Sequence, residues 1–130
     1  MNYCNRFYDR QFITRDNANK GILENFENLL NDYFNSDKPL NIGFPSVAYC
    51  AEELNLSSNY FGDLIKKETG KSAQEYIQNK IIDIAKEKVF DADKSIAEIS
   101  HELGFKYPQH FSRLFKKKTG SSPFAYRNLN

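Results

Sequence analysis

The stretch SIAEISHELGFKYPQHFSRLFKKKTGSSPFAYR, residues 95–127, carries the strongest structural signal in the chain. A Ser-x-x-Glu capping box at Ser95 predicts a helix start, and Gly104 stands where that helix should end. Pro108 opens a second helix, because proline is favoured at the first helical position, and Gly120 ends it. Two short helices joined by a turn of a few residues are typical of a helix-turn-helix unit.

A weaker copy of this pattern lies upstream at residues 47–77, VAYCAEELNLSSNYFGDLIKKETGKSAQEYI. Most of the identical pairs, such as Phe61 with Phe111 and Gly70 with Gly120, fall on apolar, capping or helix-ending positions. A repeated fold unit should preserve such positions. The differences gather in the first turn of each second helix, which is the surface that a helix-turn-helix presents to bases.

The rest of the chain predicts an all-α fold of about seven helices, with two homeodomain-like helix-turn-helix subdomains in tandem, joined by a long linker helix. We interpret residues 1–18 as a tether, the end of an upstream region. Residues 19–37 should hold an amphipathic helix, capped by Asn17 or Asn19. Its apolar stripe is expected to pack onto the following domain; a dimer seam is the alternative. Residues 38–130 should then form one unit that comprises a loop at 38–46, a first helix-turn-helix at 46–70, the linker helix at 73–90, a second helix-turn-helix at 95–120 and a final helix at 123–129.

Composition excludes several classes of protein. The 130 residues are 40% hydrophobic and 15% aromatic, which is too apolar for a disordered chain. No apolar run approaches the ~20 residues of a membrane span, and no signal peptide pattern opens the chain, so a cytoplasmic location is expected. Cys4 and Cys50 are too few for a disulfide scaffold or a zinc site. His101 and His110 have no third ligand nearby, so no metal is expected.

The net charge of +1 conceals an uneven distribution. Residues 106–127 carry six Lys and Arg and no Asp or Glu, whereas residues 57–77 carry three of each sign. Clustered basic charge is the electrostatic footprint of polyanion binding. A solvated helix face is the alternative interpretation.

The segments LGF at 103–105 and FSRLFKK at 111–117, followed by Gly120, Pro123, Tyr126 and Arg127, resemble the C-terminal signature of the AraC/XylS family of bacterial transcription regulators. The resemblance covers about residues 40–128 and is weaker in the first copy. Ile81 stands where the family often has an arginine on the linker helix.

The resemblance implies a seven-helix fold whose two recognition helices enter successive major-groove segments of double-stranded DNA. It also implies a separate sensing or dimerisation domain upstream, so we expect this fragment to be monomeric and a full-length protein to dimerise through that domain. RNA polymerase is a further candidate partner.

Base-contact candidates lie opposite the expected apolar face of each second helix. On helix 108–119 these are Gln109, His110 and Arg113, since Arg can fork onto guanine and Gln can pair with adenine. The resemblance adds Pro108. The equivalent outer positions of helix 58–69 are Asn59, Tyr60 and Asp63; the Asp63 carboxylate would be repelled by phosphates but can accept from cytosine N4. Phosphate-contact candidates are Ser57, Lys66, Lys106 and Tyr107, with Lys116 and Lys117 further along their helix.

Other functions find less support in the sequence. There is no Gly-rich phosphate loop, metal-ligand cluster or nucleophile–base pair, so neither an enzymatic activity nor a cofactor is expected. RNA binding would need exposed aromatic platforms for single strands. The alternative to DNA binding is an all-helical protein–protein interaction module.

Overall fold

The computed structural model describes residues 15–129 of the 130-residue chain. These residues form eight helices and no strand, which confirms the predicted all-α class. None of the helices in this described range is long and apolar enough to cross a membrane. The helices are α2 (Arg15–Phe34), α3 (Lys38–Ile42), α4 (Val47–Glu53), α5 (Ser58–Thr69), α6 (Ala73–Lys88), α7 (Ile96–Glu102), α8 (Pro108–Thr119) and α9 (Pro123–Arg127).

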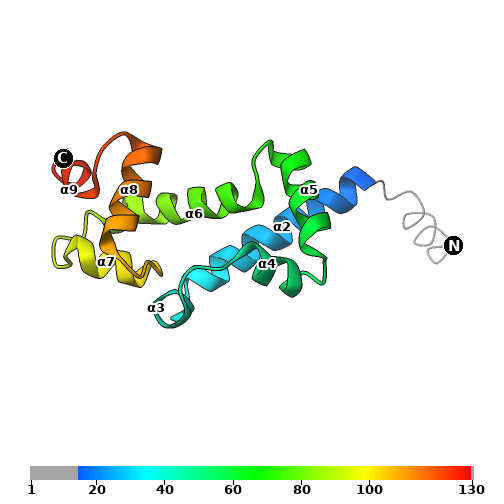
Figure 1. The fold of residues 1–130 in the computed structure, drawn as a ribbon, viewed down its shortest axis with the longest axis horizontal. Coiled ribbons are helices and arrows are strands. Elements are labelled where there is room, and N and C mark those ends of the chain that lie inside the picture. Colours follow the sequence, from blue (N-terminus) through cyan, green and yellow to red (C-terminus); the bar gives the residue numbers. More distant parts are fainter. Residues whose placement is uncertain (1–14, 130) are drawn as a thin grey trace, which may run out of the picture.

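Two helix-turn-helix units sit at opposite ends of the linker helix α6 (Figure 1). The first unit is α4 with α5, and the second is α7 with α8. Helix α2 lies against the first unit and contacts both α5 and α3. Seven helices, α3 to α9, make up the part of the chain that resembles the AraC/XylS family, and α2 is an eighth.

Local capping explains where most helices begin. The hydroxyls of Ser46, Ser57, Ser72, Ser95 and Ser122 each accept a hydrogen bond from the backbone N–H three residues later. At Ser95 the capping box is complete, because the Glu98 carboxylate also accepts from the Ser95 N–H. Past the end of α4, Asn55 has a positive φ of 59°, which Asn tolerates better than most residues.

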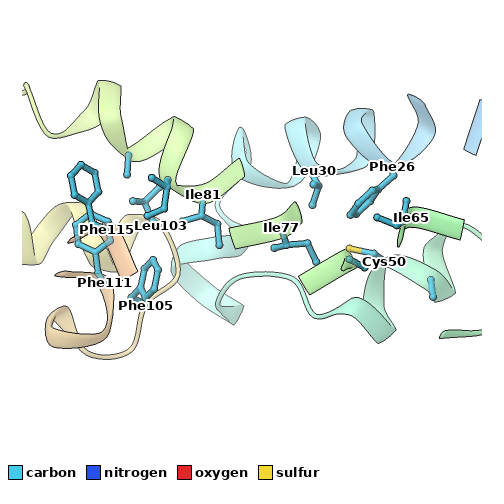
Figure 2. Close-up of a cluster of buried hydrophobic side chains, with 14 of the residues drawn as sticks. Phe26, Leu30, Cys50, Ile65, Ile77, Ile81, Leu103, Phe105, Phe111 and Phe115 are labelled. Carbon is cyan, nitrogen blue, oxygen red and sulfur yellow. The ribbon is translucent and has the colours of Figure 1, made fainter. Parts of the chain in front are cut away.

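One continuous core runs through both units along α6. Figure 2 shows Ile77 beside Cys50 and Leu30 of the first half, and Ile81 on the side of Leu103 in the second half. All five of these side chains are at most 3% exposed. Burial of each large apolar side chain stabilises the fold by about 1.5–3 kcal/mol. The linker helix is therefore packed between the two halves of the chain.

The apolar stripe of α2 packs onto the first unit, as expected. The Phe26 and Phe61 rings meet edge to face with centroids 4.9 Å apart. The Tyr76 hydroxyl on α6 donates a hydrogen bond to the Glu27 carboxylate on α2. Burial, together with this bond, raises the pKa of Tyr76. The apolar stripe of α2 therefore packs against α5 and α6 of the same chain.

The start of α2 corrects two predictions. Residues 15–18 are helical and do not belong to a tether, while residues 1–14 lie outside the described range. Asn17 and Asn19 both lie after Arg15, the first residue of α2, so neither occupies the position that precedes the helix. No Gly or Pro occurs between Arg15 and Lys20, so nothing local prevents the helix from propagating to Arg15.

The predicted loop at residues 38–46 is wrong over its first half, which forms α3. Pro39 lies in the first turn of α3, where a missing N–H costs nothing. Two other helices are shorter than predicted: α6 ends at Lys88 and α9 at Arg127.

Candidate nucleic-acid interface

Helix α8 presents one buried face and one polar face. Phe111 and Phe115 are fully buried, and Phe111 packs on Phe105 with ring centroids 5.3 Å apart. The opposite face exposes the predicted base-contact residues Gln109, His110 and Arg113, while Pro108 is half-buried at the first helical position. The helix period thus places three of the four candidates toward solvent.

Helix α5 repeats this arrangement in the first unit. Phe61 and Ile65 are fully buried, while Asn59, Tyr60 and Asp63 are exposed on the other side. The Ser57 hydroxyl accepts from the Tyr60 N–H and so orders the first turn. The two sets of candidates do not form one cluster: they lie at the two ends of α6 (Figure 1).

All phosphate-contact candidates are exposed. Ser57, Lys106 and Tyr107 lie just before α5 and α8, whereas the other three, Lys66, Lys116 and Lys117, lie in the last turns of these helices. Lys106 Nζ lies 5.7 Å from the centroid of the Tyr107 ring, and that ring meets His110 edge to face at 5.4 Å. Lys66 Nζ donates to the Gly70 carbonyl over 3.2 Å. Among the ion pairs of the described side chains, none includes Lys106, Lys116 or Lys117.

Arg127 belongs to the basic stretch at residues 106–127, but its guanidinium forms hydrogen bonds within the protein. Its Nε donates to the Val89 carbonyl over 2.5 Å, and Nη2 donates to the carbonyls of Lys94 and Asp91 over 2.8 and 3.3 Å. These carbonyls belong to the end of α6 and the following turn, where backbone acceptors have no intrahelical partner. Arg127 therefore caps the linker helix from 33 to 38 residues away in sequence.

Lys118 is likewise engaged within the protein. Its Nζ lies 3.7 Å from a Glu75 carboxylate oxygen at the start of α6. The Glu75 N–H donates to the Ser72 hydroxyl, which caps α6. With Lys118 and Arg127 both engaged, Arg113, Lys116 and Lys117 are the exposed cations of α8 that form no ion pair with the side chains the structure describes.

Helices α5 and α8, the second helix of each unit, differ in charge. Helix α8 carries Arg113 and three lysines without an acidic residue, whereas on α5 Asp63 and Glu68 balance two lysines. A cleft of about 460 Å³ lies beside the start of α8, between α6 and the segment after α3. His110 and Lys106 line it, and its lining includes no carboxylate.

Comparison with known proteins identifies the family. The model of a family described as "Helix-turn-helix domain" matches residues 50–129, more than half of the chain. The chain belongs to the AraC-type helix-turn-helix family. The match covers most of both units, including the weaker first copy.

Two curated relatives of this AraC-type chain come from Bacillus subtilis. The HTH-type transcriptional regulator YtdP is 30% identical over 119 residues, which are 92% of this chain and 14% of YtdP. The regulator YobQ is 38% identical over 69 residues, 53% of this chain and 29% of YobQ. The chain therefore spans less than a third of the length of these relatives.

Solved structures share the fold. The C-terminal domain of AraT, a response regulator from Geobacillus stearothermophilus, matches with a TM-score of 0.72 at 27% identity, covering 84% of this chain and 85% of AraT's. The DNA-binding domain of AdpA, solved in complex with a target DNA, matches with a TM-score of 0.61 at 25% identity, covering 65% and 77% of the two chains.

Proposed function

We propose that the chain is the sequence-specific, double-stranded-DNA-binding part of a bacterial transcription regulator, with α5 and α8 entering successive major-groove segments. One observation carries the proposal: α5 and α8 expose polar first turns at equivalent positions of the repeat and run in the same direction at the two ends of α6 (Figure 1). Relatives named as transcriptional regulators, and the AdpA domain solved on its target DNA, support it.

The length of α6 suits this geometry. Its 16 residues make a helix about 24 Å long. Half of a helix–helix packing distance of about 9 Å, added at each end, brings the separation of α5 and α8 to roughly 33 Å. Successive major-groove segments on one face of DNA are about 34 Å apart. The linker helix is therefore long enough to set the two recognition helices one helical turn apart.

In this proposal the polar faces of α5 and α8 would contact different bases. On α8, Arg113 would fork onto guanine and Gln109 would pair with adenine, with His110 beside them. Pro108 would chiefly fix the entry of the helix, because it is half-buried and has no N–H to donate.

On α5, Asn59 suits adenine and Asp63 suits a cytosine amino group. Tyr60 is 48% exposed and offers a hydroxyl and an apolar ring to the groove. Because α5 has no net charge, this unit would contribute base contacts more than electrostatic attraction.

The backbone of the duplex would be held by the exposed cations and helix starts, namely Ser57, Lys66, Lys106, Tyr107, Lys116 and Lys117. The second unit would supply most of this attraction, because its free cations face no neighbouring carboxylate. We assign residues 38–130 to the DNA-binding unit, in a non-catalytic protein of the bacterial cytoplasm where RNA polymerase is a further candidate partner.

A salt titration of duplex binding tests the proposal. Duplexes selected from a random pool would be labelled and titrated with the protein at several salt concentrations. The expected result is nanomolar to micromolar binding at low salt, with a log–log slope of about −0.9 for each neutralised phosphate. Failure to bind any duplex at low salt would overturn it and favour the protein–protein interaction module.

A further inference from the structure

Two glycines that are 61 residues apart meet where the segment between α3 and α4 touches the second unit. Gly43 follows α3 in the first half of the chain, and Gly104 forms the turn between α7 and α8. A methyl group placed on Gly104 would lie 2.5 Å from the Phe44 nitrogen and 2.8 Å from the Gly43 carbonyl carbon. Real Cβ atoms do not come this close to backbone, so the two turns are in direct contact through their main chains.

We propose that this contact, the Gly43–Gly104 junction, fixes the position of α8 relative to α5. It thereby sets the spacing that the protein accepts between two DNA boxes, the short base sequences that α5 and α8 each contact. The inference rests on the proposed function. It assigns the choice of spacing to backbone contacts that do not themselves touch DNA. Gly43, Gly104 and their neighbours Tyr33 and Phe44 are thus positioning residues.

Neighbouring side chains hold the junction from both sides. On the first-unit side, the buried Tyr33 hydroxyl of α2 donates to the Gly43 carbonyl over 2.5 Å. On the second-unit side, the Phe44 ring packs on Phe105 with centroids 5.3 Å apart. Phe105 in turn packs on Phe111 inside α8. A continuous set of contacts therefore joins α2, the junction and the recognition helix of the second unit.

Helix α6 carries a core that both units share, and away from α6 the helix α3 packs against α7. Beside the junction, the cleft lined by Phe44, Ile81 and His110 leaves part of the space between the two halves unfilled. The Lys118–Glu75 ion pair is partly exposed, and such pairs contribute at most about 1 kcal/mol. The junction adds a main-chain contact next to the α3–α7 packing, and a close backbone contact of this kind restricts how α7 and α8 can move relative to the first half of the chain.

Rigidity of this kind has a direct consequence for binding. Two linked modules gain avidity of about 10²–10⁴ over a single module only when both can bind at once. If the junction is intact, both recognition helices can bind at once on duplexes with one box spacing, and duplexes with a shifted spacing bind more weakly. If the junction is disrupted, the affinity for the selected spacing falls, and the difference in affinity between that spacing and the shifted ones becomes smaller.

Gly104→Ala tests the junction, and two other glycines are matched controls. Gly120 and Gly70 also have positive φ values, 88° and 75°, but a methyl group on either would meet no atom within 4 Å. Gly120→Ala and Gly70→Ala therefore carry the same kind of backbone strain without the collision. Tyr33→Phe is the second test variant. It keeps the buried ring and removes only the hydroxyl that holds Gly43, so it decides the question if Gly104→Ala fails to fold by circular dichroism.

The first readout needs no DNA. Spin labels on Ala48→Cys and Ala97→Cys, exposed and equivalent positions of α4 and α7, report the distance between the units in a Cys4→Ser background. We expect one narrow distance distribution for the parent protein and the control variants. Folded Gly104→Ala or Tyr33→Phe should give a shifted or broadened distribution. Superimposable distributions for parent, Gly104→Ala and Tyr33→Phe would overturn the junction.

The second readout uses duplexes that carry one box, or two boxes at the selected spacing and one base pair to either side. For Gly104→Ala we expect unchanged one-box affinity and about a tenfold smaller preference for the selected spacing. Equal loss on one-box and two-box duplexes would overturn the assignment, since Gly104 would then act only within its own unit. If the parent protein binds no duplex, the proposed function fails, while the spin-label distances still decide the junction.

Discussion

Replacing Arg127 by alanine should destabilise the protein without acting directly on DNA. The guanidinium makes two short hydrogen bonds, to the carbonyls of Val89 and Lys94, and a longer one to Asp91. Hydrogen bonds from a charged donor contribute about 1.5–3 kcal/mol each. Water can reach the exposed turn after truncation, so we expect a loss near the lower end, about 3 kcal/mol in total.

Thermal unfolding measures this loss. For a chain of this size, 1 kcal/mol corresponds to about 4 °C, so Arg127→Ala should lower the Tm by about 12 °C. Arg127→Lys keeps the charge but not the planar fork, and should recover less than half of the loss. Arg113→Ala is the matched control, because this arginine is exposed and lies in the same basic stretch; its effect should stay within about 0.5 kcal/mol. An Arg127→Ala Tm within about 2 °C of the parent would refute the capping role.

Three further changes test the interface and the core. Arg113→Ala should weaken binding to a selected duplex by about 1–3 kcal/mol and relax preference at one base pair; unchanged discrimination in a competition assay would remove Arg113 from the base readers. Lys117→Ala should weaken all duplexes alike and make the log–log salt slope shallower by about 1, whereas a change at one base only would contradict a phosphate contact. Burial, reinforced by Glu53, raises the pKa of the Cys50 thiol to about 12. In a Cys4→Ser background it should therefore resist a thiol reagent at about pH 9, where an ordinary cysteine ionises, and labelling at the rate of an exposed thiol would contradict its burial.

The same thiol affects stability at high pH. The pKa of Cys50 is raised in the folded protein, so between its ordinary value and the raised one the thiol ionises only in the unfolded chain. Its contribution to the free energy of unfolding is therefore complete below the ordinary pKa and is lost as the pH rises toward the raised value. Cys50→Ala should flatten that decline.

Local signals in the sequence predicted most of the helix boundaries. A serine cap such as Ser57 or Ser95 and a left-handed stop such as Gly70 act within four residues, so a single sequence contains all the information they need. The exposed positions of α5 and α8 followed from the helical period once Phe61 and Phe111 were placed in the core.

Long-range contacts explain what the sequence did not reveal. Pro39 is ambiguous by itself, since proline both ends helices and opens them, and the sequence alone did not resolve it in favour of α3. The role of Arg127 depends on carbonyls more than 30 residues away, so its charge looked like part of the basic surface. The same holds for Lys118 and Glu75.

The sequence predicted only part of the role of Gly104. Gly104 was expected as a helix stop, and its φ of 99° agrees with that. Its second role, as the place where another backbone approaches, is also typical of glycine. The sequence does not say which segment approaches, because Gly43 is distant in the chain and its neighbourhood was expected to be a loop.

The most direct test of the central claim is methylation interference on a duplex selected from a random pool. Methylation of guanine N7 blocks contacts in the major groove. If α5 and α8 enter successive segments of that groove, interference should appear as two patches about 10 bp apart on one face of the duplex. A single patch, or interference confined to adenine N3 in the minor groove, would contradict the arrangement.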